Sequence, residues 1–299
     1  MAARLMDTHS AWHLVLDAVN RTNVTLSLPE EDRPALELNG SGWRLLQPAS
    51  EEAGNLLNVF LPLCLPLTDT ESCRVVGQLG QSLDGRIATV TGASQFINGE
   101  DGLIHLHRLR AVSDAVIVGA GTASTDNPRL TVRKAPGRNP VRVVIDRHRR
   151  VPDSHHLFTD RAAPTLRLVA GTYRQNAPQS EPVEQALAAN GPVDVPCLGN
   201  PDSDTPVAPA IILQVLADFG LRKVFVEGGG LTVSTFLNAG LLDRLHVMVA
   251  PMIIGSGRPA FSLPEIDLLS DALRPRAQLV NLGSDMLFDL DFSVQRPPN

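Results

Sequence analysis

Two acidic residues each follow a short apolar run and precede glycine, a pattern that places a carboxylate where a strand ends. Glu227 stands between residues 222–226 and three consecutive glycines at 228–230, and Asp84 precedes glycine within residues 80–88. In an open α/β sheet, ligands bind at the carboxyl ends of the parallel strands. A triple glycine costs backbone entropy that a simple turn rarely requires. We therefore interpret Glu227 and Asp84 as candidate catalytic residues, although an ordinary hairpin turn explains Asp84 equally well.

Two glycine-rich segments could cradle a phosphate, because each follows a β-rich run and opens a helical pattern. A helix N-terminus presents free N–H groups to an anion. The segment at 119–122 lacks the third glycine of a dinucleotide fingerprint, since Ser124 stands there, so we do not expect a true Rossmann fold. The expected phosphate contacts are Gly119, Gly121, Thr122, Gly229, Gly230, Leu231 and Thr232.

Arginines supply candidate phosphate partners in a chain of net charge −6. Arg133 ends the segment 126–133, which suits a substrate loop because a guanidinium matches phosphate geometry. The basic cluster at 146–150, which contains Arg147, follows a predicted strand, where an NADP enzyme needs cations for the 2′-phosphate. A solvated basic face is an equal alternative for that cluster. His105 and His107 do not share a helix face, so we expect no metal site.

The composition excludes several classes of protein. The 299 residues are 43% hydrophobic, which is enough for a sizeable core. A mildly acidic chain has no global attraction for nucleic acid or an anionic membrane. Its three cysteines form no CxxC pair, and we find neither a signal peptide nor an apolar stretch long enough to span a bilayer. A reducing cytoplasm is the expected location.

The order of apolar runs predicts a three-layer α/β domain over residues 73–299 with a mixed, mostly parallel sheet. Residues 1–72 carry one helical pattern, with Thr8 or Ser10 as its cap, and no chemical motif, so we interpret them as an appendage of unknown role. Residues 172–207 are interpreted as a loop-rich insertion around one helix. Strands are predicted at 74–79, 114–118, 141–145, 166–170, 222–226 and 245–250, helices at 105–112, 183–189, 208–219 and 232–238, and a terminal hairpin at 278–292.

Six segments in one order resemble the reductase domain of the riboflavin biosynthesis deaminase/reductase family, which has a dihydrofolate-reductase-like fold. The segments read SLDGRIA, RLRAVSDAVIVGAGT, DNPRLTVR, PVRVVID, VEGGG and FLNAGLLDRLHVMVAPMIIGSG. The resemblance covers about residues 74–293. It implies an NADPH-dependent, cytoplasmic and homodimeric reductase that converts the ribose of 5-amino-6-(5-phosphoribosylamino)uracil, a small phosphorylated pyrimidine, to the ribityl form by hydride transfer.

The resemblance also implies residue roles. NADPH is expected at Gly80, Phe96, Thr122, Asp126, Arg147 and residues 229–235, and the substrate at Ser94, Arg110, Leu130, Arg133 and Glu227.

Two departures from the family pattern bear on the reaction. Gln78 stands where many bifunctional members have lysine, and a carboxamide carries no charge and transfers no proton. The zinc deaminase signature is absent, because Cys197 is not followed by a second cysteine at the required spacing, so no deaminase activity is expected. Two alternatives stay open: a reductase of another pyrimidine or pteridine-like compound, and a non-catalytic nucleotide-binding module.

Overall fold

The computed structural model describes residues 5–28, 33–40, 42–68, 71–94, 97–173, 180–200, 202 and 207–293, with backbone only at 180–183. The chain divides into two compact units, Met1–Glu71 and Ser72–Asn299. No helix within the described ranges is both long and apolar enough to cross a membrane.

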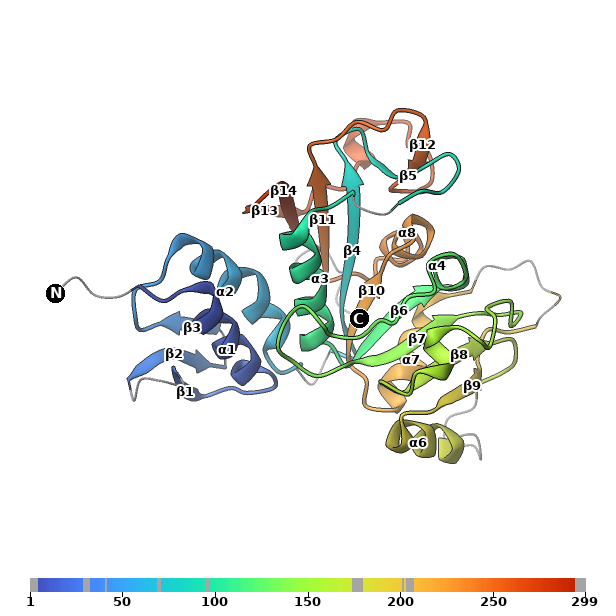
Figure 1. Ribbon diagram of the computed structural model, residues 1–299, viewed down its shortest axis with the longest axis horizontal. Helices are drawn as coiled ribbons and strands as arrows, with labels where there is room; N and C mark the ends of the chain where they lie inside the picture. The colour runs from blue at the N-terminus through green and yellow to red at the C-terminus, as the bar shows by residue number, and fades with distance from the viewer. Residues whose placement is uncertain are drawn as a thin grey trace. The chain divides into compact units, whose positions relative to one another are not determined.

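The first unit packs two helices with a small antiparallel sheet (Figure 1). Trp12 and Phe60, one from each helix, meet edge to face with ring centroids 5.2 Å apart in its core. The first helix is capped by Asp7, which accepts a 2.8 Å hydrogen bond from the Ser10 N–H, so the expected cap at Thr8 or Ser10 was wrong. The elements are α1 (Thr8–Ala18), β1 (Val24–Ser27), β2 (Pro34–Asn39), β3 (Gly42–Leu45) and α2 (Glu51–Cys64).

The second unit is built on a nine-stranded sheet in the order β13-β14-β11-β4-β10-β6-β7-β8-β9. Neighbours from β11 to β9 pair in parallel, while β14 is antiparallel to β11 and to β13, which confirms the mixed, mostly parallel sheet. The strands are β4 (Arg74–Ser82), β6 (Ala115–Gly119), β7 (Val141–Ile145), β8 (Thr165–Val169), β9 (Pro192–Pro196), β10 (Lys223–Glu227), β11 (Arg244–Ala250), β13 (Arg276–Leu282) and β14 (Asp285–Asp291).

Helices cover both faces of this sheet, because alternate residues of each central strand point to opposite sides. On β4, the glycine at position 77 faces Val233 of α8, whereas Gln78 faces the side covered by α3. The helices are α3 (Glu100–Val112), α4 (Ala120–Asp126), α5 (His156–Thr159), α6 (Ser180–Ala189), α7 (Pro209–Asp218) and α8 (Gly230–Asn238), with a 3₁₀ turn at Leu269–Asp271.

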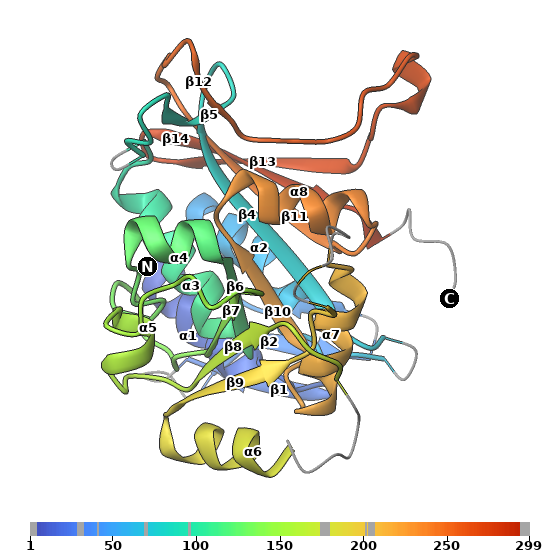
Figure 2. The same ribbon diagram turned by 90° about the vertical axis from the view of Figure 1, so that its right-hand side faces the viewer.

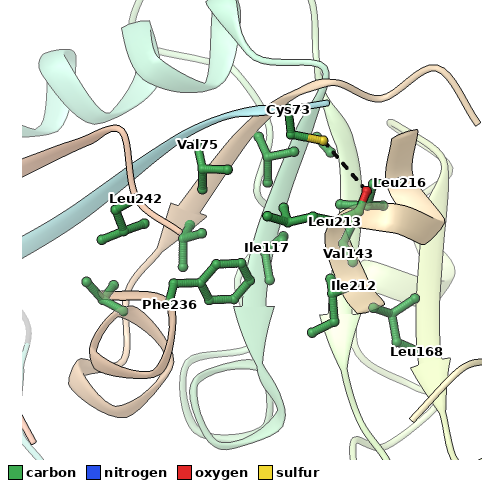
Figure 3. Packing of buried hydrophobic residues seen from close by; sticks show 14 of the residues in the cluster. Cys73, Val75, Ile117, Val143, Leu168, Ile212, Leu213, Leu216, Phe236 and Leu242 are labelled. Carbon is green, nitrogen blue, oxygen red and sulfur yellow. Dashed lines mark hydrogen bonds between the residues drawn. The ribbon is translucent and has the colours of Figure 1, made fainter. Parts of the chain in front are cut away.

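The core on the α7 and α8 side is continuous and almost wholly aliphatic (Figure 3). Val75, Ile117 and Val143 project from β4, β6 and β7 toward Ile212 and Phe236 of the two helices, all fully or nearly fully buried. A buried aliphatic or aromatic side chain of this size contributes about 1.5–3 kcal/mol of transfer free energy. This packing holds the carboxyl ends of the central strands rigidly in place.

Three features depart from the sequence predictions. Residues 172–207 are not only a loop-rich insertion, since β9 forms the outer strand of the sheet there. Residues 86–89 and 257–259 form an additional two-stranded sheet, β5 (Arg86–Thr89) with β12 (Gly257–Pro259). Residues 1–72 contain a second helix besides the one predicted, since the apolar residues 56–64 belong to α2, where Pro62 is tolerated near the end of the helix.

Candidate active site

A cavity of about 580 Å³ lies at the carboxyl ends of β4, β6 and β10. Strand ends, the α3 face and the segment after β6 all contribute to its wall. Among the expected site residues, those lining it are Gly80, Ser94, Gly121, Thr122, Asp126, Leu130, Glu227 and Gly229. Residues far apart in sequence therefore meet at one edge of the sheet, as the strand order predicts.

A second cavity of about 660 Å³ adjoins the first and extends toward α7. Its wall includes the N-terminal residues of α4 and α8, Ile145 at the end of β7 and Ile212 of α7. The expected residues Gly119, Gly121, Thr122, Gly229, Gly230, Leu231 and Thr232 line it. The two cavities share Ile87, Gly121, Thr122, Gly229 and Arg258.

The two glycine segments touch each other where the cavities meet. A Cβ on Gly119 would lie 2.6 Å from Thr232 Oγ1, and one on Gly229 would lie 2.8 Å from Thr122 Oγ1. Gly229 also has φ +69°, which L side chains rarely adopt, and a side chain on Gly230 would overlap the Ala260 carbonyl. The glycines are therefore required by close backbone approach, and they expose main chain to the cavity.

The Glu227 carboxylate accepts two hydrogen bonds from the buried guanidinium of Arg110. Arg110 Nε donates to Oε2 at 2.7 Å and Nη2 to Oε1 at 2.5 Å, while Nη1 donates to the Thr131 carbonyl at 2.9 Å. The Arg110 side chain is 5% exposed and the Glu227 side chain 13%. Glu227 lines the cavity and Arg110 does not. Arg110 thus fixes the carboxylate from behind, and its expected contact with the substrate stays a prediction.

Asp84, the second candidate catalytic carboxylate, is held mainly by main-chain donors and lies outside the cavity lining. Its carboxylate accepts hydrogen bonds from the Ser82 hydroxyl at 2.5 Å and from the N–H groups of Ile254 and Gly255 at 3.1 and 2.7 Å. These bonds lower the pKa of Asp84 to about 2. Among the described residues, Asp84 lines neither cavity. Asp84 therefore ties the β4–β5 turn to the loop after β11, and its predicted catalytic role has no support from the cavity lining.

The loop after α4 brings Leu130 to the cavity wall with φ +52°, almost fully buried. Arg133 lies on the same loop, exposed and outside the cavity lining, and Nη1 donates to Thr131 Oγ1 at 2.5 Å. Its backbone N–H donates to His107 Nδ1 at 3.0 Å. Burial, followed by Arg110 and Arg133, lowers the pKa of His107 to about 4, so this histidine is a neutral acceptor near pH 7. The predicted contact at Phe96 lies outside the described residues.

The expected 2′-phosphate contact, Arg147, follows the end of β7 beside the second cavity without lining it. Its Nε donates to the Leu198 carbonyl at 2.9 Å. The neighbouring Asp146 is buried and accepts the N–H groups of Arg150 and Val151, so its carboxylate closes the turn. Asp126 lines the first cavity, where burial raises its pKa while Arg258 acts in the opposite direction.

Two carboxamides line the first cavity: Gln78, noted from the sequence only as a departure from the family lysine, and Asn98, which was not identified from the sequence. Gln78 is 4% exposed, and its Oε1 has no hydrogen-bond partner among the described residues. The Asn98 Nδ2 atom is also buried and has no hydrogen-bond partner among the described residues. A side chain at Gly80 would overlap Asn98 Oδ1, so this glycine makes room for the carboxamide. Unsatisfied buried polar atoms of this kind indicate a polar ligand, since leaving them unpaired is unfavourable.

Two histidines of the second unit form a buried network with Asp289, outside the lining of both cavities. His105 and His246 are buried and bonded ring nitrogen to ring nitrogen at 2.9 Å, and Asp289 lies 3.3 Å from the other His246 nitrogen. Burial, then His246, lowers the pKa of His105 well below its ordinary value. Within the described ranges no three His, Cys, Asp or Glu residues form a group that could hold a metal ion.

The chain is an α/β protein with a cavity at the carboxyl ends of its parallel strands, walled by two glycine turns, where proteins of this class bind ligands. The model of the RibD C-terminal domain matches residues 74–286, and the chain belongs to this family. It is 36% identical over 222 residues to the 2,5-diamino-6-ribosylamino-4(3H)-pyrimidinone 5′-phosphate reductase of Methanothermobacter thermautotrophicus, a match that covers 72% of this chain and 96% of the relative.

Longer relatives match over part of their length. Riboflavin biosynthesis protein RibD of Bacillus amyloliquefaciens is 34% identical over 212 residues, which is 71% of this chain and 52% of that protein. The solved structure of Acinetobacter baumannii RibD, form 1, has a TM-score of 0.59 and 26% identity, covering 80% of this chain and 62% of that one. The chain thus spans about half of the curated RibD sequence. The structural likeness confirms the predicted reductase-domain fold.

Proposed function

We propose that this chain reduces the ribosyl group of a phosphoribosylamino-pyrimidine of riboflavin biosynthesis, with NADPH as the reductant. The relative from Methanothermobacter, matched over nearly its whole length, carries the name of such a reductase. The observation that carries the proposal is the Glu227 carboxylate, fixed by Arg110 in a cavity that continues into two touching glycine turns. The first cavity, with Glu227, suits the reacting sugar, and the second cavity, with the glycine turns, suits a nucleotide.

The residues present fit a dinucleotide. The N-terminus of α8 and the turn before α4 leave main-chain N–H groups without helical partners, and no side chain stands between them and the second cavity at Gly119, Gly229 and Gly230. When bound, the reduced nicotinamide would supply the hydride.

The chain itself would orient the sugar and move a proton. Reductive opening of a ribosylamine breaks the bond between the first carbon and the ring oxygen, and the carbon gains a hydride while the oxygen gains a proton. Among the described residues of the first cavity, Glu227 and Asp126 are the carboxylates. We assign the proton step to Glu227, because two guanidinium bonds fix its orientation while one side of the group faces the cavity. General acid–base assistance of this kind contributes about 10²–10⁴-fold.

The preference for NADPH over NADH is proposed to rest on Arg147. A carboxylate at the end of β7 would favour the free 2′-hydroxyl of NADH, but Asp146 uses both of its oxygens within the turn. Arg147 then offers positive charge beside the second cavity. A titration of the purified chain with NADPH and with NADH, repeated on Arg147→Ala, tests this: the variant should lose affinity for NADPH alone.

A homodimer is proposed from the exposed apolar side chains between β11 and β14. Residues 260–275 run out from the body of the second unit beside the β13–β14 hairpin (Figure 2). The large exposed side chains here are Ile253, Ile266, Leu268, Leu269, Leu273 and Leu279, each more than half exposed. An apolar surface of this extent is typical of a protein interface. Light scattering coupled to gel filtration checks it, and a monomer at micromolar concentration would refute it.

The reaction is tested by following NADPH oxidation with each of the two candidate pyrimidines. These are 2,5-diamino-6-ribosylamino-4(3H)-pyrimidinone 5′-phosphate and 5-amino-6-(5-phosphoribosylamino)uracil. Turnover of either, with the ribityl product identified by mass, supports the proposal. Tight NADPH binding with no oxidation in either assay would refute the reductase function and favour a nucleotide-binding module.

A further inference from the structure

Arg258 lies where the two cavities meet. Among the described residues that line either cavity, it is the one cation, and it lines both. It extends from β12, the short strand that pairs with β5. The other shared residues are Ile87, Gly121, Thr122 and Gly229, so the guanidinium stands over the place where the two glycine turns touch.

The Arg258 residue is exposed, and its guanidinium is unpaired in the described part of the chain. Within the described residues it has neither a hydrogen bond nor an ion pair, and its electrostatic effect is felt by Asp126. A Cβ added to Gly92 would lie 3.0 Å from Nη2 and 3.4 Å from Cζ, so the guanidinium packs against the glycine of a turn. Other arginines around the site are engaged, as Arg110 is with Glu227. An exposed cation at a junction of cavities, with no protein partner among the described residues, is available to an anionic ligand.

We propose that Arg258 binds the pyrophosphate of the dinucleotide. The inference rests on the proposed function. A dinucleotide consists of two nucleosides joined by a pyrophosphate, so a molecule filling both cavities puts its phosphates at their junction. The glycine turns approach that junction from the sheet, and Arg258 approaches it from β12. A planar guanidinium can bond both phosphates at once.

Binding measured by calorimetry on the full chain separates this role from its alternatives. The ligands are NADPH, 2′-phospho-ADP-ribose, which keeps the pyrophosphate and lacks nicotinamide, and 2′-AMP, which lacks the pyrophosphate. The variants are Arg258→Ala, Arg258→Lys and the control Arg86→Gln. Arg86 belongs to the same two-stranded sheet, donates to the Gly255 carbonyl and lines neither cavity. Thermal unfolding of each variant verifies that it is folded.

Arg258→Ala should weaken NADPH and 2′-phospho-ADP-ribose equally, by about tenfold to a hundredfold, the loss expected for charge-assisted hydrogen bonds. The affinity of Arg258→Ala for 2′-AMP should equal that of the wild type. The affinity of Arg258→Lys for NADPH should lie between those of the wild type and Arg258→Ala. Arg86→Gln should bind all three ligands as the wild type does. Equal losses for 2′-AMP would overturn the proposal in favour of a 2′-phosphate contact. Unchanged NADPH affinity with a raised KM for the pyrimidine would overturn it in favour of the substrate phosphate. Failure of the wild type to bind any dinucleotide would instead refute the proposed function.

Discussion

The end of β10 and the turn after β4 present the same local sequence, an acidic residue followed by glycine at the end of a central strand. At the first, Glu227 faces a cavity and is held by the side chain of Arg110. At the second, Asp84 accepts two main-chain N–H groups and one hydroxyl and lies outside both cavities. The strands supplying them, β10 and β4, are neighbours in the sheet.

The difference between these two carboxylates lies in what satisfies them. Main-chain donors lock Asp84 into a turn, and a carboxylate used in that way shapes a loop. The hydrogen bonds to the Glu227 carboxylate come instead from the Arg110 side chain of α3, which leaves the end of β10 open to a ligand. The partner of an acidic residue therefore decides whether it builds structure or is available for chemistry.

The largest effect is expected for Glu227→Gln. The carboxamide keeps the shape of the side chain and cannot move a proton, so kcat should fall about 10²–10⁴-fold. NADPH affinity should stay at the wild-type value, because the glycine turns and Arg258 are untouched. Single-turnover kinetics and NADPH titration measure the two quantities. A variant with normal kcat would assign the proton step elsewhere and remove the main distinction between Glu227 and Asp84.

Removing the guanidinium should destabilise the fold. Arg110→Met leaves a largely buried carboxylate without its partner, so the free energy of unfolding should fall by about 3 kcal/mol. The control is Arg138→Met, which breaks the more exposed pair with Asp114, where the arginine side chain is 59% exposed, and should cost about 1 kcal/mol or less. Urea unfolding measures both. Equal losses would show that the Arg110–Glu227 pair behaves as an ordinary surface pair.

Much of the second unit is predictable because its central strands are buried on both faces. Residues 115–119, 141–145 and 223–227 are apolar runs, and each one pairs in parallel within the sheet. Such runs have few other possible environments. The first and last of these runs lead into the glycines at 119 and 229–230, which mark the cavity edge because close backbone approach there admits no side chain.

The remaining features depend on contacts that local sequence does not encode. The edge strand β9 has proline at both ends and Asp194 between its valines, which reads as a loop. Arg110 meets Glu227 across 117 positions, and no short pattern connects them. Arg258 follows an irregular glycine-containing loop, and only the pairing of β12 with β5 brings it to the cavities. Such residues become visible once the sheet order is known.

A smaller effect, confined to the KM of the substrate, is expected for Gln78, which pairs with Glu227 across β4 and β10. Its buried Oε1 has no described partner, so Gln78→Ala should remove a hydrogen bond to the pyrimidine and raise the substrate KM about tenfold. The control is Gln81→Ala, on the same strand and outside both cavities. Initial rates at saturating NADPH measure it. A weaker NADPH affinity instead would place Gln78 beside the cofactor.

The smallest effect is expected for Asp84→Asn, and it should depend on pH. The hydrogen bonds to its carboxylate lower the pKa of Asp84 from its ordinary value of 3.8 to about 2. A group with a lowered folded pKa contributes stability above its unfolded pKa, and this contribution is lost as pH falls through the folded value. Wild type should therefore exceed Asp84→Asn in stability near neutral pH, and the difference should shrink from about pH 4 to about pH 2.

Urea unfolding at several pH values measures this difference, and initial rates near neutral pH measure the activity of the same variant. Because the Asp84 bonds stay within the turn and the loop after β11, kcat should remain that of the wild type. A loss of kcat comparable to that of Glu227→Gln would return Asp84 to the chemistry, and the two strand ends would then be alike in function as they are in sequence.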